Sequence, residues 1–104
     1  MKRPRLVLSE AAVVDILEQA QWYHEQSGPA LAKRWEKAVA DVLLGVVKNP
    51  GKGAECQFRH PDLRGVKRLP ILGFSRHLLF YKFLASEIFV LRIVHGARDL
   101  ENLL

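Results

Sequence analysis

Apolar and polar positions alternate most clearly in the second half of the chain. Two apolar runs rich in β-branched and aromatic residues, 74–84 and 88–94, flank a short polar break at 85–87. This pattern is typical of a β-hairpin. If the three residues of the break form the loop, Leu84 faces Ile88, and alternate positions then share a face of the sheet. One face is almost wholly apolar and holds Leu79, Tyr81, Phe83, Phe89, Leu91 and Ile93.

The opposite face of this hairpin has a mixed character. It holds Arg76, Leu78, Phe80, Lys82, Ile88, Val90, Arg92 and Val94. Such a face is too apolar for open solvent and too charged for an ordinary core. Something should therefore cover it. The two alternatives are the C-terminal tail of the chain itself and a separate protein partner.

The first half of the chain predicts a short strand and a helical hairpin. An apolar run at 5–8 is followed by Ser9, a good helix N-cap. Apolar residues then recur at helical spacing from 10 to about 26 and again from 29 to 48. The apolar stripe of these helices should pack on the apolar face of the later sheet. Trp35 lies on the stripe and is expected in the core, whereas Trp22 lies off it and is expected to be partly exposed.

The remaining segment contains one long irregular connection and one further strand. Residues 50–65 are rich in glycine, proline and polar residues, and 66–69 then form a short apolar and basic run. The predicted order is β-α-α-β-β-β. We therefore expect a single α+β domain over residues 1–104, with an N-terminal strand and an antiparallel helical hairpin packed on a small, mainly antiparallel sheet of about four strands.

Composition and charge narrow the setting in which the protein works. The single cysteine, Cys56, cannot form an internal disulfide, which suits a reducing cytoplasm. No apolar run approaches the length of a membrane span. The net charge is +5, and the excess lies from Lys48 onward, where 10 bases face 5 acids. We expect a cytoplasmic protein without a membrane partner, whose sheet half attracts anionic partners.

Four segments together resemble a known family. They are the helical pair ending in Asn49-Pro50, the stretch LRGVKRLP at 63–70, the hairpin with Arg76 and Phe80-Tyr81, and the ending LRIVHGARDL at 91–100. In order and spacing they are similar to the ParE branch of the RelE/ParE toxin superfamily, over nearly the whole chain. The chain departs from that pattern at 75–77, where many members carry Arg-Tyr-Arg and this chain carries Ser-Arg-His.

The resemblance implies the toxin of a type II toxin–antitoxin pair, neutralised by a cognate ParD-like antitoxin. ParE-like members inhibit DNA gyrase and block replication, whereas RelE-like relatives cut messenger RNA on the ribosome. The first activity is inhibition by binding and the second is enzymatic. A generic nucleic-acid-binding module is a third hypothesis, weakened because the sheet lacks the exposed aromatic pairs that single-strand binders use.

The sequence offers an incomplete set of groups for the nuclease alternative. A metal-independent ribonuclease needs a base, an acid and cations placed together, and His95 and Arg98 are the first candidates. No tyrosine follows Arg98, where RelE-like nucleases carry one. His77 and His95 share a parity but lack a third ligand, so we expect no metal site and no cofactor.

Inhibition by binding needs only a surface, and the sequence suggests two sets of residues for it. The basic residues expected on or beside the sheet, as a target-binding set, are Arg64, Lys67, Arg68, Arg76, Arg92 and Arg98. A disordered antitoxin segment that folds on binding would cover the mixed hairpin face. The expected antitoxin-binding set is Leu78, Phe80, Ile88, Val90, Arg92 and Val94.

Overall fold

The computed structural model describes residues 3–96 and confirms the α+β architecture. The elements in chain order are β1 (Arg5–Leu8), α1 (Glu10–Ser27), α2 (Pro29–Lys48), β2 (Ala54–Glu55), a 3₁₀ turn η1 (Pro61–Leu63), β3 (Lys67–Ile71), β4 (Phe74–Leu84) and β5 (Glu87–His95). The sheet has five strands and not about four, because β2 forms inside the connection that the sequence predicted to be irregular. No helix within the described residues is long and apolar enough to cross a membrane.

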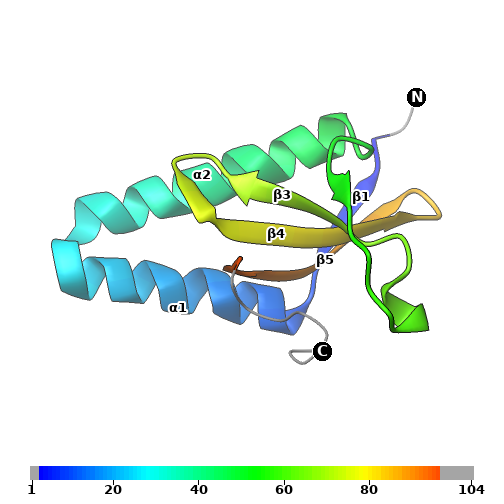
Figure 1. Ribbon diagram of the computed structural model, residues 1–104. Coiled ribbons are helices and arrows are strands. Elements are labelled where there is room, and N and C mark those ends of the chain that lie inside the picture. Colours follow the sequence, from blue (N-terminus) through cyan, green and yellow to red (C-terminus); the bar gives the residue numbers. More distant parts are fainter. Residues whose placement is uncertain (1–2, 97–104) are drawn as a thin grey trace.

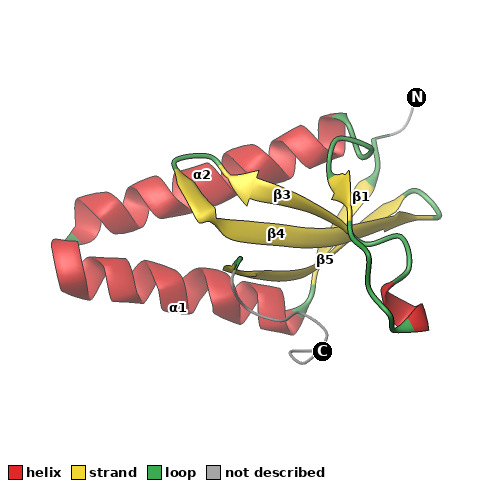
Figure 2. Ribbon diagram, viewed as in Figure 1, coloured by secondary structure: helices red, strands yellow, loops and turns green. Residues whose placement is uncertain are grey.

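The five strands form one mixed sheet with the order β1-β5-β4-β3-β2. The pair of β1 and β5 is parallel and the other pairs are antiparallel. The antiparallel helices α1 and α2 lie side by side on one face of this sheet (Figures 1 and 2). The fold therefore has two layers, and we call the face of the sheet turned away from the helices the outer face.

Local signals explain why the helical hairpin forms where the sequence predicts it. The Ser9 hydroxyl accepts a 2.9 Å hydrogen bond from the backbone N–H of Ala12, which caps α1. Gly28 follows α1 with a positive φ of 88°, which a glycine adopts without strain. Pro29 then starts α2 at a position where its missing N–H costs nothing. Two adjacent residues thus specify the end of α1 and the beginning of α2.

The turn between β4 and β5 is shorter than the sequence predicted. It consists of Ala85 and Ser86 alone, with φ of 51° and 65°, as in the two-residue turns that suit the twist of a hairpin. Leu84 therefore pairs with Glu87, and Phe83 pairs with Ile88. The asparagine or glycine that usually marks such a turn is absent, so the sequence carried little sign of it.

The shorter turn changes which residues of β5 face the helices. The predicted placement of Ile88 and Val90 on the outer face is wrong, because both are fully buried in the core beneath the helices. Leu91 packs instead on the outer face, against a second cluster that includes Phe80 and Val94. A bulge next to Leu91 restores the predicted parity, so that Ile93 again faces the helices. Phe83, predicted on the same apolar face, is 43% exposed near the hairpin tip.

The main core lies between the helical pair and the sheet. Its buried members are Ala12, Ala20, Trp35, Val39, Val46, Ile71, Leu79, Tyr81, Ile88, Val90 and Ile93. Trp35 is completely buried and Trp22 is 53% exposed, as the helical stripe predicted. Burial of this apolar surface is the main source of stability.

Tyr81 attaches the connection after α2 to the sheet. Its hydroxyl donates a 2.7 Å hydrogen bond to the carbonyl of Pro50 and accepts a 2.9 Å bond from the N–H of Gly53. A Cβ on Gly53 would lie 2.7 Å from that hydroxyl oxygen, so only glycine allows this approach. Burial raises the pKa of Tyr81. The phenol therefore stays neutral and serves as a structural hydrogen-bonding group.

Removing this hydroxyl is expected to destabilise the fold. In a Tyr81→Phe variant the buried N–H of Gly53 and the carbonyl of Pro50 lose their partner, which costs about 1–3 kcal/mol. Urea unfolding measures the loss. Tyr23→Phe is the matched control, because no hydrogen bond to the Tyr23 hydroxyl is found within the described residues, and its change should be about 0.5 kcal/mol or less. Equal losses in both variants would contradict the anchoring role of Tyr81.

Candidate functional site

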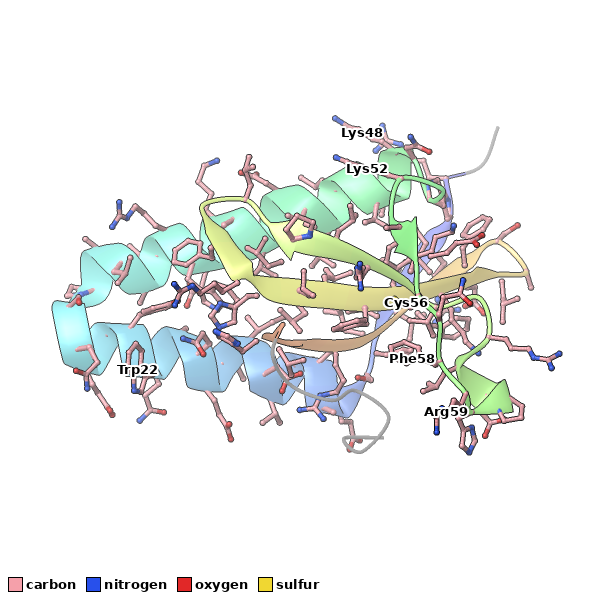
Figure 3. The ribbon with its side chains drawn as sticks, viewed as in Figure 1. Trp22, Lys48, Lys52, Cys56, Phe58 and Arg59 are labelled. Carbon is pink, nitrogen blue, oxygen red and sulfur yellow. The ribbon has the colours of Figure 1, made fainter. Side chains whose placement is uncertain are left out.

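The outer face of the sheet is partly covered by the connection between α2 and β3. Leu63 and Val66 from this connection pack on Phe80 of β4 and Val94 of β5, and all four are buried. Cys56 and Phe58, which Figure 3 labels near the strands, also pack on this cluster. The sequence predicted that the C-terminal tail or a partner would cover this face. The internal connection between α2 and β3 covers part of it instead.

Some apolar surface of this cluster stays accessible. Half-buried residues surround the buried ones, and we call this set the outer patch: Cys56, Phe58, Leu78 and Leu91. Of the residues predicted to bind an antitoxin, Phe80 and Val94 are buried members of this cluster on the outer face, and Leu78 belongs to the patch. Ile88 and Val90 lie on the helix side of the sheet.

Exposed cations accompany the outer patch. Arg68 pairs with Phe80 across β3 and β4, so both side chains belong to the outer face. Arg76 precedes Leu78 by two positions on β4 and shares its face. Arg64 is exposed directly after η1. These three predicted residues therefore lie on or beside one surface, where an acidic partner would meet them.

Of the other residues in the predicted target-binding set, Lys67 has a different placement and Arg98 is not described. Lys67 pairs with Tyr81, which places it on the helix side of the sheet, and its ammonium lies 3.8 Å from the carboxylate of Glu55. Arg98 lies outside the described residues, so its position relative to the outer patch is not part of the structure.

Arg92 is engaged in an ion pair that the sequence did not predict. Its Nε and Nη2 each donate a 2.8 Å hydrogen bond to the carboxylate of Asp15 on α1. The same carboxylate accepts a 3.0 Å bond from the backbone N–H of Ile93. The two side chains are only 17% and 11% exposed, and the hydrogen bonds to Asp15 raise the pKa of Arg92 further. Arg92 therefore joins α1 to β5, just beyond Val90, the last residue of β5 that pairs with β1.

The sequence contained one sign of this pair. Asp15 stands between Ala12 and Ile16, on the side of α1 that faces the sheet. An acid at such a position needs a partner when it is buried. The partner lies 77 residues away, so no local pattern could identify it.

The two histidines of the hairpin lie together at the open end of the sheet. His77 pairs with His95 across β4 and β5, with ring centroids 5.7 Å apart. The His77 ring also packs against Trp35, with ring centroids 5.0 Å apart. Its Nδ1 is buried without a hydrogen-bond partner. Burial and the neighbouring His95 lower the pKa of His77. No group of three or more histidine, cysteine or acidic side chains within residues 3–96 could hold a metal ion.

Acidification is expected to destabilise the fold through His77. The pKa of His77 in the folded state lies below its ordinary value of 6.5, so the unfolded chain binds more protons between the two values. The stability that depends on a neutral His77 is fully present above pH 6.5. It is lost as the pH falls from 6.5 through the lower pKa of the folded state. Urea unfolding at a series of pH values should show a steeper loss for the wild type than for His77→Gln. Equal slopes would contradict this cause.

A pocket opens beside the histidine pair. It has a volume of about 560 Å³ and lies between α1 and the ends of β4 and β5. Its lining residues are Asp15, Glu18, Gln19, Trp22, Tyr23, His77, Arg92, Ile93, Val94 and His95. His95, the candidate acid or base of the nuclease alternative, thus lies in a pocket, while its predicted partner Arg98 is outside the described residues.

Comparisons with known proteins agree with the fold and with the resemblance. The family model for the ParE toxin of the type II toxin–antitoxin system parDE matches residues 6–100. A solved structure described as the chromosomal ParDE toxin–antitoxin system from P. aeruginosa is similar, with a TM-score of 0.73 and 19% identity, covering 89% of this chain and 96% of that one. No curated protein matches significantly. Because the family model spans most of its length, the chain belongs to the ParE family of type II toxin–antitoxin toxins.

Proposed function

We propose that this toxin inhibits DNA gyrase through the outer face of its sheet and that a ParD-like antitoxin neutralises it by covering the same face. The observation that carries the proposal is the combination of an accessible apolar patch with the exposed cations Arg64, Arg68 and Arg76. Inhibition by binding requires no catalytic group. The proposed gyrase inhibition rests on the family, and the geometry supports a binding surface.

Charge supports an anionic target for this face. The chain carries +5, and its excess of bases lies in the half that builds β3, β4 and β5. Exposed arginines attract DNA or an acidic protein surface over distances of about a Debye length and also orient the encounter. The DNA in a gyrase complex presents such an anionic surface through its phosphates.

The same face suits an antitoxin segment that folds on binding. Apolar side chains of such a segment would pack on Leu78, Leu91 and Phe58, and its acids would meet Arg68 and Arg76. Ile88 and Val90 have no part in this contact because they are buried beneath the helices. Arg92 also has no direct part, since Asp15 holds its guanidinium.

The second candidate is the RelE-like ribosome-dependent endoribonuclease. The observation that favours it is the exposed His95 beside His77 in a pocket of about 560 Å³. An imidazole there could act as a general acid or base. The cations on the outer face would then hold messenger RNA and not gyrase.

Pulse labelling separates the two candidates. The chain is induced in bacteria without an antitoxin, and the incorporation of labelled thymidine and labelled methionine is followed over the first minutes. Gyrase inhibition predicts an early loss of thymidine incorporation while methionine incorporation continues. An early loss of methionine incorporation would contradict the proposal and favour the nuclease, with His95→Ala as its first test.

A charge reversal tests the proposed surface directly. The Arg68→Glu/Arg76→Glu variant should lose most of its inhibition of gyrase supercoiling in vitro, by at least about tenfold in the concentration needed. Lys33→Glu/Arg34→Glu is the matched control, because both residues are exposed on α2, away from the outer face. Circular dichroism checks that both variants fold. Equal inhibition by the two variants would rule out the outer face as the gyrase surface.

A further inference from the structure

The pocket between α1 and the histidine pair has a charge opposite to that of the rest of the chain. Asp15 and Glu18 contribute two negative charges and Arg92 one positive charge, so the lining carries −1 with neutral histidines. Asp15 and Arg92 neutralise each other as an ion pair. Glu18 also interacts electrostatically with Arg92, so two carboxylates face one guanidinium in this lining. On a protein of charge +5, this pocket is a site where a cation is attracted and not repelled.

An exposed tryptophan forms part of the same wall. Trp22 is 53% exposed and follows Glu18 by one helical turn on α1, so the two side chains point the same way. Figure 3 labels Trp22 on this helix. Tyr23 packs edge-on against the indole, with ring centroids 5.5 Å apart. The face of an indole is the aromatic surface that binds cations best.

The opposite wall contributes the imidazole of His77, whose Nδ1 is buried and does not open on the pocket. A neutral imidazole carries one nitrogen that accepts a hydrogen bond. The imidazole of His95 is exposed and lies beside His77 in the same lining. The pocket thus combines a carboxylate, an indole and imidazoles around one volume of about 560 Å³.

We propose that this pocket is a binding site for the guanidinium group of an arginine on a partner polypeptide. A guanidinium is planar, so it can stack on Trp22 while its N–H groups reach the Glu18 carboxylate and the imidazole wall. A lysine ammonium is more strongly hydrated and cannot stack in this way. The site lies beside the outer face and shares Val94 with its buried cluster, but its occupation does not depend on whether gyrase is the target.

Nuclear magnetic resonance of the two tryptophan indole N–H groups tests the proposal on the full chain. The probe is acetyl-Gly-Arg-Gly-amide at low salt, and the neutral control is the same peptide with citrulline. The Trp22 signal should shift and saturate, with a dissociation constant of about a millimolar. The Trp35 signal should stay constant, because that indole is buried and bonded to the carbonyl of Ile16. The citrulline peptide should bind at least about tenfold more weakly.

Two glutamate variants localise the effect on α1. Glu18→Gln should weaken binding of the arginine peptide by about fivefold, since it removes one of the two negative charges of the lining. Glu25→Gln, two turns further on and also exposed, should leave binding unchanged. Equal binding of the arginine and citrulline peptides, or no effect of Glu18→Gln, would overturn the proposal. An Arg98→Ala variant that binds the peptide at least tenfold more tightly would also overturn it, because the occupant would then be the chain itself.

Discussion

Replacing Asp15 with alanine is expected to destabilise the fold by about 3–5 kcal/mol, as breakage of a buried ion pair does in other proteins. The carboxylate accepts hydrogen bonds from two guanidinium nitrogens of Arg92 and from the backbone of Ile93. Its removal takes the bonded carboxylate from a mostly buried guanidinium and the side-chain acceptor from the N–H of Ile93. Both losses weaken the contact between α1 and β5.

Urea unfolding measures this loss, and two further variants identify its cause. Asp41→Ala is the matched control: its carboxylate pairs with Lys37 on the exposed side of α2, and the change should be about 0.5 kcal/mol or less. Asp15→Leu/Arg92→Met should lose less than Asp15→Ala, because it removes both charges together. A loss below about 1 kcal/mol for Asp15→Ala would show that solvent compensates the guanidinium and that the pair does not hold the helix.

Replacing Trp35 with alanine is expected to cost about 3–5 kcal/mol, the range for deletion of a large aromatic side chain from a core. Its ring contacts Tyr23, Phe74 and His77, and its Nε1 donates a hydrogen bond to the carbonyl of Ile16. The indole thus joins both helices to β4. Loss of the ring leaves a cavity that this double-layer structure cannot fill by simple collapse.

The second tryptophan supplies the control for this prediction. Trp22→Ala removes the same side chain from an exposed position and should cost about 1 kcal/mol or less. Trp35→Phe should fall between the two, since it keeps most of the packing and loses the hydrogen bond. Chemical unfolding of the three variants, followed by circular dichroism, gives the comparison. Similar losses for Trp35→Ala and Trp22→Ala would contradict the assignment of Trp35 to the core.

The register of the β4–β5 hairpin shows where prediction from the sequence failed. Ala85 and Ser86 form the whole turn at positive φ, although neither residue type favours that conformation. Long-range pairing therefore imposes the turn. A single residue of difference in loop length moved Ile88 and Val90 into the core and Leu91 to the outer face, because side chains alternate along a strand.

The candidate surfaces were predictable to different degrees. Arg76 could be placed on the outer face from the alternation along β4, which the length of the turn does not alter, whereas Arg68 was predicted only on or beside the sheet. The target and antitoxin contacts proposed for Arg64, Arg68, Arg76 and Leu78 stay predictions. The sequence offered no sign that Leu63 and Val66 would cover Phe80, because the connection that carries them has no regular pattern.

By itself, the sequence determined the elements that depend on near neighbours along the chain. The Ser9 cap, the Gly28-Pro29 junction and the helical stripe through Trp35 act within a few residues, so local composition specified the helical hairpin and the side that it buries. Tertiary structure alone decided the fifth strand, the register of β5, the cover over the outer face and the pairing of Asp15 with Arg92. Each of these joins segments distant in sequence, and their choice depends on the packing energy of the whole domain and not on local preference.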